Sequence, residues 1–285
     1  MTRKALRRPR DPRRLLAWLV LGLTGLIYAV PLYWLLVTSL KSKGELYRAT
    51  VTLYPHSPTL EPYVRVLFER GFWVLLRNSV LVCGTTVLVT LTLGLLIVYP
   101  ITRLKVSPRV RRGVLNWALS LRFMPPVAVV IPYFALVRTA DLYDTPQALV
   151  VIYALFTLPF AIWMLKGFLD EIPAEIEEAA YVDGGSRWKV FWLVILPLAA
   201  PGLLASGIIV FIFTWSEFLF ALILTATPNS QTFPVGVQGL VTQFEVIWND
   251  MAAAGAIAMV VPLTLALLAR RYLVTGLTFG VIREK

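Results

Sequence analysis

Long apolar runs dominate the hydropathy pattern of this 285-residue chain. A helix needs roughly 20 apolar residues to cross a bilayer, because each residue advances it by only about 1.5 Å. Six stretches reach this length with no more than one charged side chain each. We therefore predict an all-α membrane protein with six transmembrane helices. The predicted helices occupy residues 15–40, 78–102, 113–137, 145–165, part of 201–227, and 251–269.

Proline residues occur inside several of the predicted helices. Membrane helices tolerate proline because neighbouring helices can bind the backbone groups that it frees. We therefore expect the third helix to continue through Pro125 and Pro126, and the fourth to continue through Pro159.

The composition agrees with a membrane protein. Hydrophobic residues make up 58% of the chain and charged residues 15%, and the mean hydropathy is +0.74. The hydrophobic share exceeds that of ordinary soluble domains. The single cysteine, Cys83, excludes an internal disulfide, and the single histidine, His56, has no companion ligand nearby. We expect neither a disulfide framework nor a metal site.

Basic residues are distributed unevenly between the two sides of the predicted bilayer. Residues 1–14, 103–112, 166–189 and 270–285 carry 19 of the 27 lysines and arginines. Cytoplasmic segments of membrane proteins carry such an excess, so both termini are predicted to be cytoplasmic. The net charge of +11 therefore reflects topology. We expect no nucleic-acid partner, because such a surface would group basic and aromatic residues on a soluble face.

The spans and their orientation divide the chain into five parts. An outer segment fits either a helix resting on the membrane surface or a docking surface for an external protein, and both interpretations stay open. The predicted parts are a basic cytoplasmic tail at 1–14, a first transmembrane helix at 15–40, an extracytoplasmic segment at 41–73, a membrane core of the second to sixth helices at 74–270 that includes a cytoplasmic loop at 167–197, and a cytoplasmic tail at 271–285.

The cytoplasmic loop at 167–197 is more structured than a simple connection needs to be. Glu177, Glu178, Ala179 and Ala180 favour a helix, and Gly184 with the following glycine can form the left-handed turn that ends it. The small alanine side chains allow another surface to approach closely. We predict a rigid acidic helix on which a soluble partner can push or pull.

The sequence contains none of the chemistry of an ATPase. It has no Gly-Lys-Ser or Gly-Lys-Thr segment of a phosphate-binding loop and no histidine-based acid–base pair. We expect that the chain is not an enzyme; if it moves a solute uphill, the energy must come from a partner or an ion gradient. Transport driven by a partner protein is the first possibility. An ion-coupled secondary carrier of small polar solutes is the alternative to it, and a membrane scaffold without transport is a third possibility. Carriers usually hold several ionisable groups at mid-membrane, whereas only Arg122 and Glu217 qualify here.

Glu217 lies beside Trp215 and Ser216 in the fifth predicted helix. These residues fit a polar and aromatic patch on a solute path near the outer gate. Equally, the carboxylate can be structural and bonded to neighbouring helices. Arg122, roughly 14 Å inside the membrane at the helical rise, fits a structural or gating role. We expect no direct ion pair between Arg122 and Glu217, because the latter lies nearer the outer end of its helix.

The spacing within the cytoplasmic loop resembles a known family. The segment Glu178-Ala-Ala-x-x-x-Gly184, followed after nine residues by Val194-x-Leu196-Pro197, resembles the signature loop of ABC importer permeases. Other segments resemble the carbohydrate-importer branch, in particular the second permease of the maltose type. They include Met124-Pro-Pro-Val, Leu158-Pro-Phe-Ala-Ile-Trp-Met164, Trp215-Ser-Glu-Phe-Leu-Phe-Ala221 and Gly276-Leu-Thr-Phe-Gly280.

The resemblance implies the type I ABC importer permease fold and a subunit that forms half of a translocation pore for a sugar, oligosaccharide or polyol. Its implied partners are a second homologous permease, two ABC ATPase subunits and an extracytoplasmic solute-binding protein, in a bacterial-type inner membrane. The chain itself would bind no cofactor, since ATP and Mg²⁺ are used by the ATPase subunits.

The resemblance also assigns residues to the contact with the ATPase. Glu178 would pair with a basic residue of the ATPase groove, while Ala179 and Ala180 would permit close contact. Gly184 would make the turn, and Gly185 stands where the family often has alanine. The full set of predicted coupling residues is Glu177, Glu178, Ala179, Ala180, Asp183, Gly184, Leu196 and Pro197, of which the last two would return the chain to the membrane.

Overall fold

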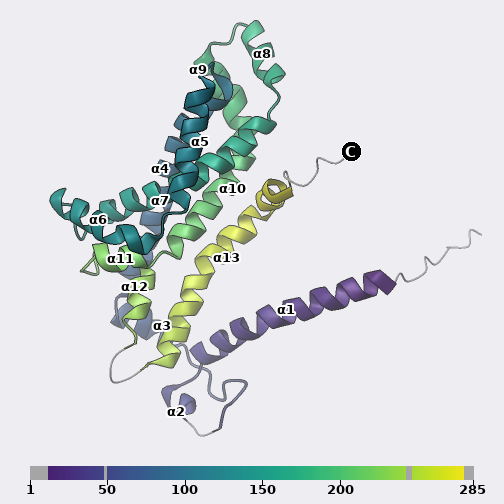
Figure 1. Ribbon diagram of the computed structural model, residues 1–285. Helices are drawn as coiled ribbons and strands as arrows, with labels where there is room; N and C mark the ends of the chain where they lie inside the picture. The colour runs from purple at the N-terminus through teal and green to yellow at the C-terminus, as the bar shows by residue number, and fades with distance from the viewer. Residues whose placement is uncertain (1–11, 48–49, 242–245, 279–285) are drawn as a thin grey trace, which may run out of the picture. The chain divides into compact units, whose positions relative to one another are not determined.

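Helices build the part of the chain that the structure describes. The computed structural model describes residues 12–47, 50–241 and 246–278, and this part contains helices but no strand (Figure 1). The predicted all-α fold is confirmed. Most of the predicted tail at 1–14, and residues 279–285 of the other, lie outside the described residues.

The described residues form two compact units. Unit 1 contains the residues up to Arg70 and those from 246 to Ala256. Unit 2 contains Gly71–Val241 and the residues from Ile257 onwards, so helix α13 (Trp248–Thr278) begins in one unit and continues in the other.

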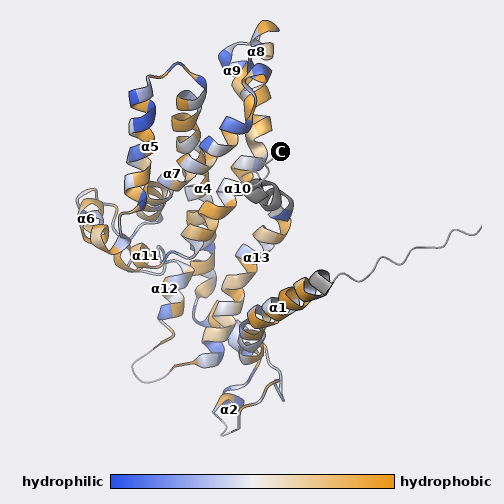
Figure 2. Ribbon diagram, turned by 45° about the vertical axis from the view of Figure 1, so that its right-hand side comes forward, coloured by the Kyte–Doolittle hydropathy of each residue, from blue (hydrophilic) through white to orange (hydrophobic). Residues whose placement is uncertain are grey.

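Five helices of the described chain are long and apolar enough to cross a membrane, and a bent pair provides up to one more. Only 6% of the α1 span is buried. Apolar surface of this extent is stable against lipid or a membrane partner but not in water. Figure 2 shows hydrophobic residues along α1 and α10, with hydrophilic residues at α8, α9 and the start of α5. The five spans are Leu16–Ser39 in α1 (Pro12–Ser39), α4 (Phe72–Arg103), α7 (Pro146–Glu171), Arg187–Trp215, and Trp248–Leu268 in α13.

The predicted third helix at 113–137 is wrong as a single element. The chain forms α5 (Pro108–Arg122) and α6 (Pro126–Thr139), whose axes differ by 101°. Pro125 is extended, with φ −69° and ψ 131°, and Pro126 occupies the first turn of α6. Proline removes a backbone donor and disfavours helical backbone in the residue before it. Two consecutive prolines therefore end one helix and start another.

The predicted fifth span is displaced towards the loop. The span begins at α9 (Arg187–Val190), passes through the π-helical turn η2 (Phe191–Ile195) and continues as α10 (Leu196–Trp215). The wider π turn ends two residues before Pro197, which has no N–H to donate to the preceding turn. The helix stops at Trp215, so Glu217 lies in the connection to α11 (Leu219–Leu224) and not inside a helix.

The core of unit 2 forms where its long helices meet. Helix α4 packs against α7 and α10, and α5 and α10 also pack against α7. Between α4 and α7 the buried hydroxyls of Thr90 and Thr157 lie 3.1 Å apart. The buried side chains at the α6, α7 and α11 end of this core include Val130, Leu149, Ile152, Tyr153, Phe220 and Leu224.

A carboxylate holds the turn between α6 and α7. Asp144, with φ +60°, accepts hydrogen bonds from the Ser230 hydroxyl and from the backbone N–H groups of Ala226 (2.8 Å) and Thr227 (3.0 Å). Burial raises the pKa of Asp144, but these hydrogen bonds outweigh burial and lower it to about 2. The turn is thereby fixed to the segment between α11 and α12 (Phe233–Gln238).

Unit 1 is organised around two carboxylates. Glu45 in α2 (Lys43–Leu46) accepts hydrogen bonds from the Thr52 hydroxyl (2.8 Å) and the His56 N–H (3.1 Å). Asp250, at the start of α13, has no exposed surface. Its carboxylate pairs with Arg65 at 2.9 Å and Arg70 at 3.2 Å, at the π turn Arg65–Glu69 that follows α3 (Glu61–Val64). A buried charge needs such partners, since leaving it unpaired is costly.

Candidate functional site

Helix α8 (Ala174–Val182) presents the predicted coupling surface. Glu178, Ala179 and Asp183 are exposed, and Ala180 is half-buried. Val182, which motif spacing did not single out, is 87% exposed. The loop therefore places acidic, small and apolar side chains together on a surface open to a partner.

The end of α8 has the geometry predicted from its two glycines. Gly184 has φ +84°, in the left-handed region. Its N–H donates to the Tyr181 carbonyl at 3.0 Å, and the Gly185 N–H donates to the Ala180 carbonyl at 3.0 Å. This pair of bonds is a Schellman motif, which fixes the direction of the chain after the helix.

Close packing leaves no room for a side chain at position 185, which explains the second glycine. A Cβ at this position would lie 2.7 Å from the Ala180 carbonyl oxygen and 2.8 Å from Cγ2 of Val190. Both distances are too short for a real Cβ atom, so an alanine here would displace either the helix end or α9. In this chain glycine at 185 brings α9 close against the end of α8.

Glu177 differs from its neighbour Glu178 because it points inward. Its side chain is buried, and it accepts hydrogen bonds from the hydroxyls of Tyr181 (2.8 Å) and Tyr99 (3.0 Å). Burial and the hydrogen bond to Glu177 raise the pKa of Tyr181. Arg103 Nε lies 3.6 Å from the other carboxylate oxygen. Motif analysis named Glu177 but missed Tyr99 and Arg103, which lie on α4, far away in the sequence.

Leu196 and Pro197 are the first two residues of α10, inside the span that begins at Arg187. Leu196 is half-buried and Pro197 is exposed. Just before them, the ring of Phe191 packs edge-on against Tyr99 at 4.8 Å. The loop therefore contacts Tyr99 of α4 from both sides of its turn, through Glu177 before Gly184 and through Phe191 after it.

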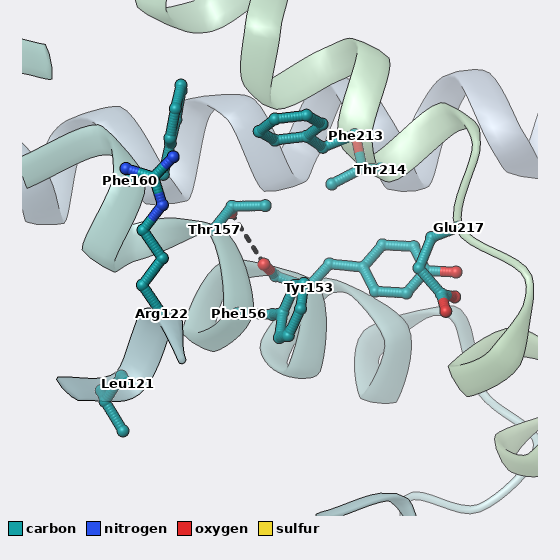
Figure 3. A pocket seen from close by; sticks show the side chains of 9 residues that line it. All are labelled: Leu121, Arg122, Tyr153, Phe156, Thr157, Phe160, Phe213, Thr214 and Glu217. Atoms are coloured by element: carbon teal, nitrogen blue, oxygen red, sulfur yellow. Dashed lines mark hydrogen bonds between the residues drawn. The ribbon is translucent and has the colours of Figure 1, made fainter. Parts of the chain in front are cut away.

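A cavity of about 280 Å³ lies between α5, α7 and α10 (Figure 3). At one end the Arg122 guanidinium lies 5.4 Å from the centre of the Phe160 ring, a cation–π contact. At the other end the hydroxyl of Tyr153 points towards Glu217. The lining residues are Leu121, Arg122, Tyr153, Phe156, Thr157, Phe160, Phe213, Thr214 and Glu217.

Glu217 both bonds to α11 and lines the cavity. Its carboxylate accepts hydrogen bonds from the N–H groups of Phe220 (2.9 Å) and Ala221 (3.2 Å), and so caps the start of α11. The same side chain lines the cavity. Arg122 lines the opposite end, and the structure shows no ion pair between these two described residues (Figure 3).

Trp215 and Ser216 do not line this cavity. Trp215 is buried, donates from Nε1 to the Ala258 carbonyl at 3.1 Å and stacks on Phe211 with ring centres 5.6 Å apart. Ser216 terminates α10 and is exposed. The structure thus brings Arg122 and Glu217 to one site and gives Trp215 a place in the packing between α10 and α13.

Both the loop and the cavity lie within the part of the chain that matches a known protein family. Residues 90–278 match the family described as the inner membrane component of binding-protein-dependent transport systems. A sulfoquinovosyl glycerol transport system permease of Agrobacterium fabrum is 32% identical over 269 residues, which are 94% of this chain and 93% of that protein. A trehalose transport system permease of Mycobacterium tuberculosis is 35% identical over 275 residues, which are 95% of this chain and 98% of that protein.

A solved structure shows the same fold. It is a chain of a bacterial ABC transporter involved in the import of the acidic polysaccharide alginate, with a TM-score of 0.76 and 19% identity. The match covers 94% of this chain and 99% of that one. With the fold and the family match in agreement, the chain belongs to the family of inner membrane components of binding-protein-dependent transport systems, the ABC importer permeases.

Proposed function

We propose that this permease forms half of the translocation path of an ATP-driven carbohydrate importer and receives the movement of the ATPases through α8. The observation that carries the coupling is the surface of α8. Glu178 and Ala179 are exposed at a helix end that Gly184 and the buried Glu177 hold in one geometry. A rigid acidic surface can transmit a push that a mobile loop would absorb.

The proposed cycle is alternating access. ATP binding closes the two ATPase subunits, and Glu178, paired with a basic residue of the ATPase groove, moves with them. Helix α8 carries this movement to the membrane helices and the path opens to the outside. Hydrolysis then restores the inward-facing state. ATP and Mg²⁺ act only in the ATPase subunits.

The cavity between α5, α7 and α10 is the proposed part of the path in this chain. Aromatic rings can cover the apolar faces of a sugar, while Arg122 and Glu217 can bind its hydroxyl groups. Its volume of about 280 Å³ is slightly below the range of small-molecule sites, roughly 300–1,000 Å³. A second permease would complete the site. The names of the relatives, which transport trehalose and sulfoquinovosyl glycerol, support a carbohydrate.

The proposed complex contains this permease, a second homologous permease, two ABC ATPase subunits and an extracytoplasmic solute-binding protein. It lies in a bacterial-type inner membrane with both termini of this chain in the cytoplasm. The distribution of basic residues supports this orientation.

Reconstitution tests the proposed function. The complex is purified through a tag on this chain, placed in liposomes, and supplied with its binding protein and a panel of labelled sugars and polyols. We expect uptake with ATP on the ATPase side and none with a proton gradient alone. A matched complex whose ATPase subunit cannot hydrolyse ATP is the control. Uptake driven by the proton gradient without ATP would support an ion-coupled carrier and refute the proposal.

A further inference from the structure

Three helices of unit 2 meet at the side chain of Arg103. This residue ends α4, and its side chain is largely buried. Its Nη2 donates to two backbone carbonyls at the end of α7, those of Leu169 (2.6 Å) and Ile172 (2.7 Å). Its Nε faces the Glu177 carboxylate of α8 at 3.6 Å. One guanidinium therefore joins α4, α7 and α8.

The bonds from Arg103 reach carbonyls at the end of α7. The last carbonyls of an α-helix have no partner within the helix, and a cation there also interacts favourably with the negative end of the helix dipole. The planar guanidinium holds its donors in a fixed fork, so it can bind two carbonyls through Nη2 while its Nε faces a carboxylate. Arg103 is thus suited to hold the end of α7 and the base of α8 together.

Two tyrosines complete the connection. Tyr99, one helical turn before Arg103 on α4, and Tyr181 on α8 both donate to the same Glu177 oxygen. Tyr99 also packs against Phe191. The carboxylate is therefore held from α4 and from its own helix, and Glu177 is only 6% exposed.

Helix α7 connects this cluster to the cavity. The helix ends where Arg103 binds it, and it carries Tyr153, Phe156, Thr157 and Phe160 of the cavity wall. The Thr157 hydroxyl lies 3.1 Å from that of Thr90 on α4. A displacement of α8 that is carried by Arg103 thus reaches the cavity along a single helix that is also fixed to α4.

We propose that Tyr99, Arg103, Glu177 and Tyr181 form a latch that transmits the movement of α8 to α4 and α7. This inference rests on the proposed function, because it assumes that α8 is moved by an ATPase. Within it, Glu178 meets the partner, whereas Glu177 is a positioning residue that connects the partner-facing surface to the membrane helices.

The latch is tested by the amount of solute transported per ATP hydrolysed. Purified, reconstituted complexes carry Glu177→Gln, Tyr99→Phe or both. Tyr99→Phe removes one hydroxyl and retains the ring that packs on Phe191. Glu175→Gln, an exposed position on the same helix, is the matched control. Copurification of the ATPase subunits, ATP hydrolysis and uptake are measured on the same preparations.

We expect all variants to retain the ATPase subunits and to hydrolyse ATP. Transport per ATP should fall about tenfold in Glu177→Gln and about threefold in Tyr99→Phe, the range in which coupling between sites is altered by single residues. The double variant should lose less than the product of the two single losses, because Tyr99 and Glu177 are in direct contact and changes at contacting residues are not additive. Glu175→Gln should match the wild type.

Several results would overturn the latch. One is an unchanged amount of solute transported per ATP hydrolysed in Tyr99→Phe and Glu177→Gln, when the wild type transports with ATP. Another is loss of the ATPase subunits from Glu177→Gln, which would assign Glu177 to the partner interface. If Glu177→Gln does not assemble at all, the ratio in Tyr99→Phe decides alone. Failure of the wild type to use ATP would instead refute the proposed function.

Discussion

Gly184→Pro is expected to abolish uptake while leaving the protein in the membrane. Gly184 has φ +84°, whereas proline is restricted to about −65°. Proline would also remove the N–H that bonds to the Tyr181 carbonyl. The chain after α8 would then leave the helix in another direction. Helix α8 would be held differently, and Glu178 and Ala179 would no longer meet the ATPase surface together. Membrane insertion depends on the apolar spans and should not change.

A graded series at position 184 isolates the backbone requirement. Asparagine enters the left-handed region more readily than alanine, and alanine more readily than proline. Uptake should therefore decrease from glycine to asparagine to alanine to proline, at equal amounts of protein in the membrane fraction. Wild-type uptake by the proline variant would remove this turn from the mechanism.

Replacement of Glu217 by leucine is expected to lower uptake more than replacement by glutamine. Leucine removes both functions of this side chain, the cap on α11 and the polar group in the cavity. The loss of a helix cap costs about 1 kcal/mol. The loss of a hydrogen bond that a charged group accepts from the solute costs about 1.5–3 kcal/mol, which corresponds to at least about tenfold in affinity.

Glutamine separates the two functions of Glu217, because its amide oxygen can still accept from Phe220 or Ala221 and only the charge is lost. We expect Glu217→Gln to raise the solute concentration for half-maximal uptake while thermal stability stays near that of the wild type. Leucine should change both quantities. Unchanged uptake kinetics in Glu217→Gln would restrict Glu217 to the structural role of capping α11.

The sequence predicted those features that depend on neighbouring residues. Apolar runs of sufficient length identified the membrane helices, because the bilayer imposes one length on every span. The acidic helix and its left-handed end at Gly184 followed from helix propensity and from the freedom of glycine. These are local properties that one segment determines by itself.

The features that could not be predicted depend on which of two local structures is more stable, or on contacts between residues far apart in the chain. A membrane helix tolerates proline when neighbouring groups form hydrogen bonds with the backbone groups that proline frees. At Pro125 and Pro126 the chain bends instead. Glu217 was placed inside a helix because the hydropathy pattern cannot show that its carboxylate binds the N–H groups of Phe220 and Ala221. The contact between Tyr99 and Glu177 spans 78 positions in the chain, so no motif could reveal it.

The most direct test of the central claim is a photo-crosslinking residue at position 178 in cells that express the whole transporter. Position 60, exposed in the segment between α2 and α3 and predicted to lie outside, serves as the matched control. We predict that position 178 crosslinks to the ABC ATPase subunit, that the yield changes when ATP hydrolysis is blocked, and that position 60 gives no such product. Absence of an ATPase crosslink at position 178, in cells where uptake is normal, would contradict the account.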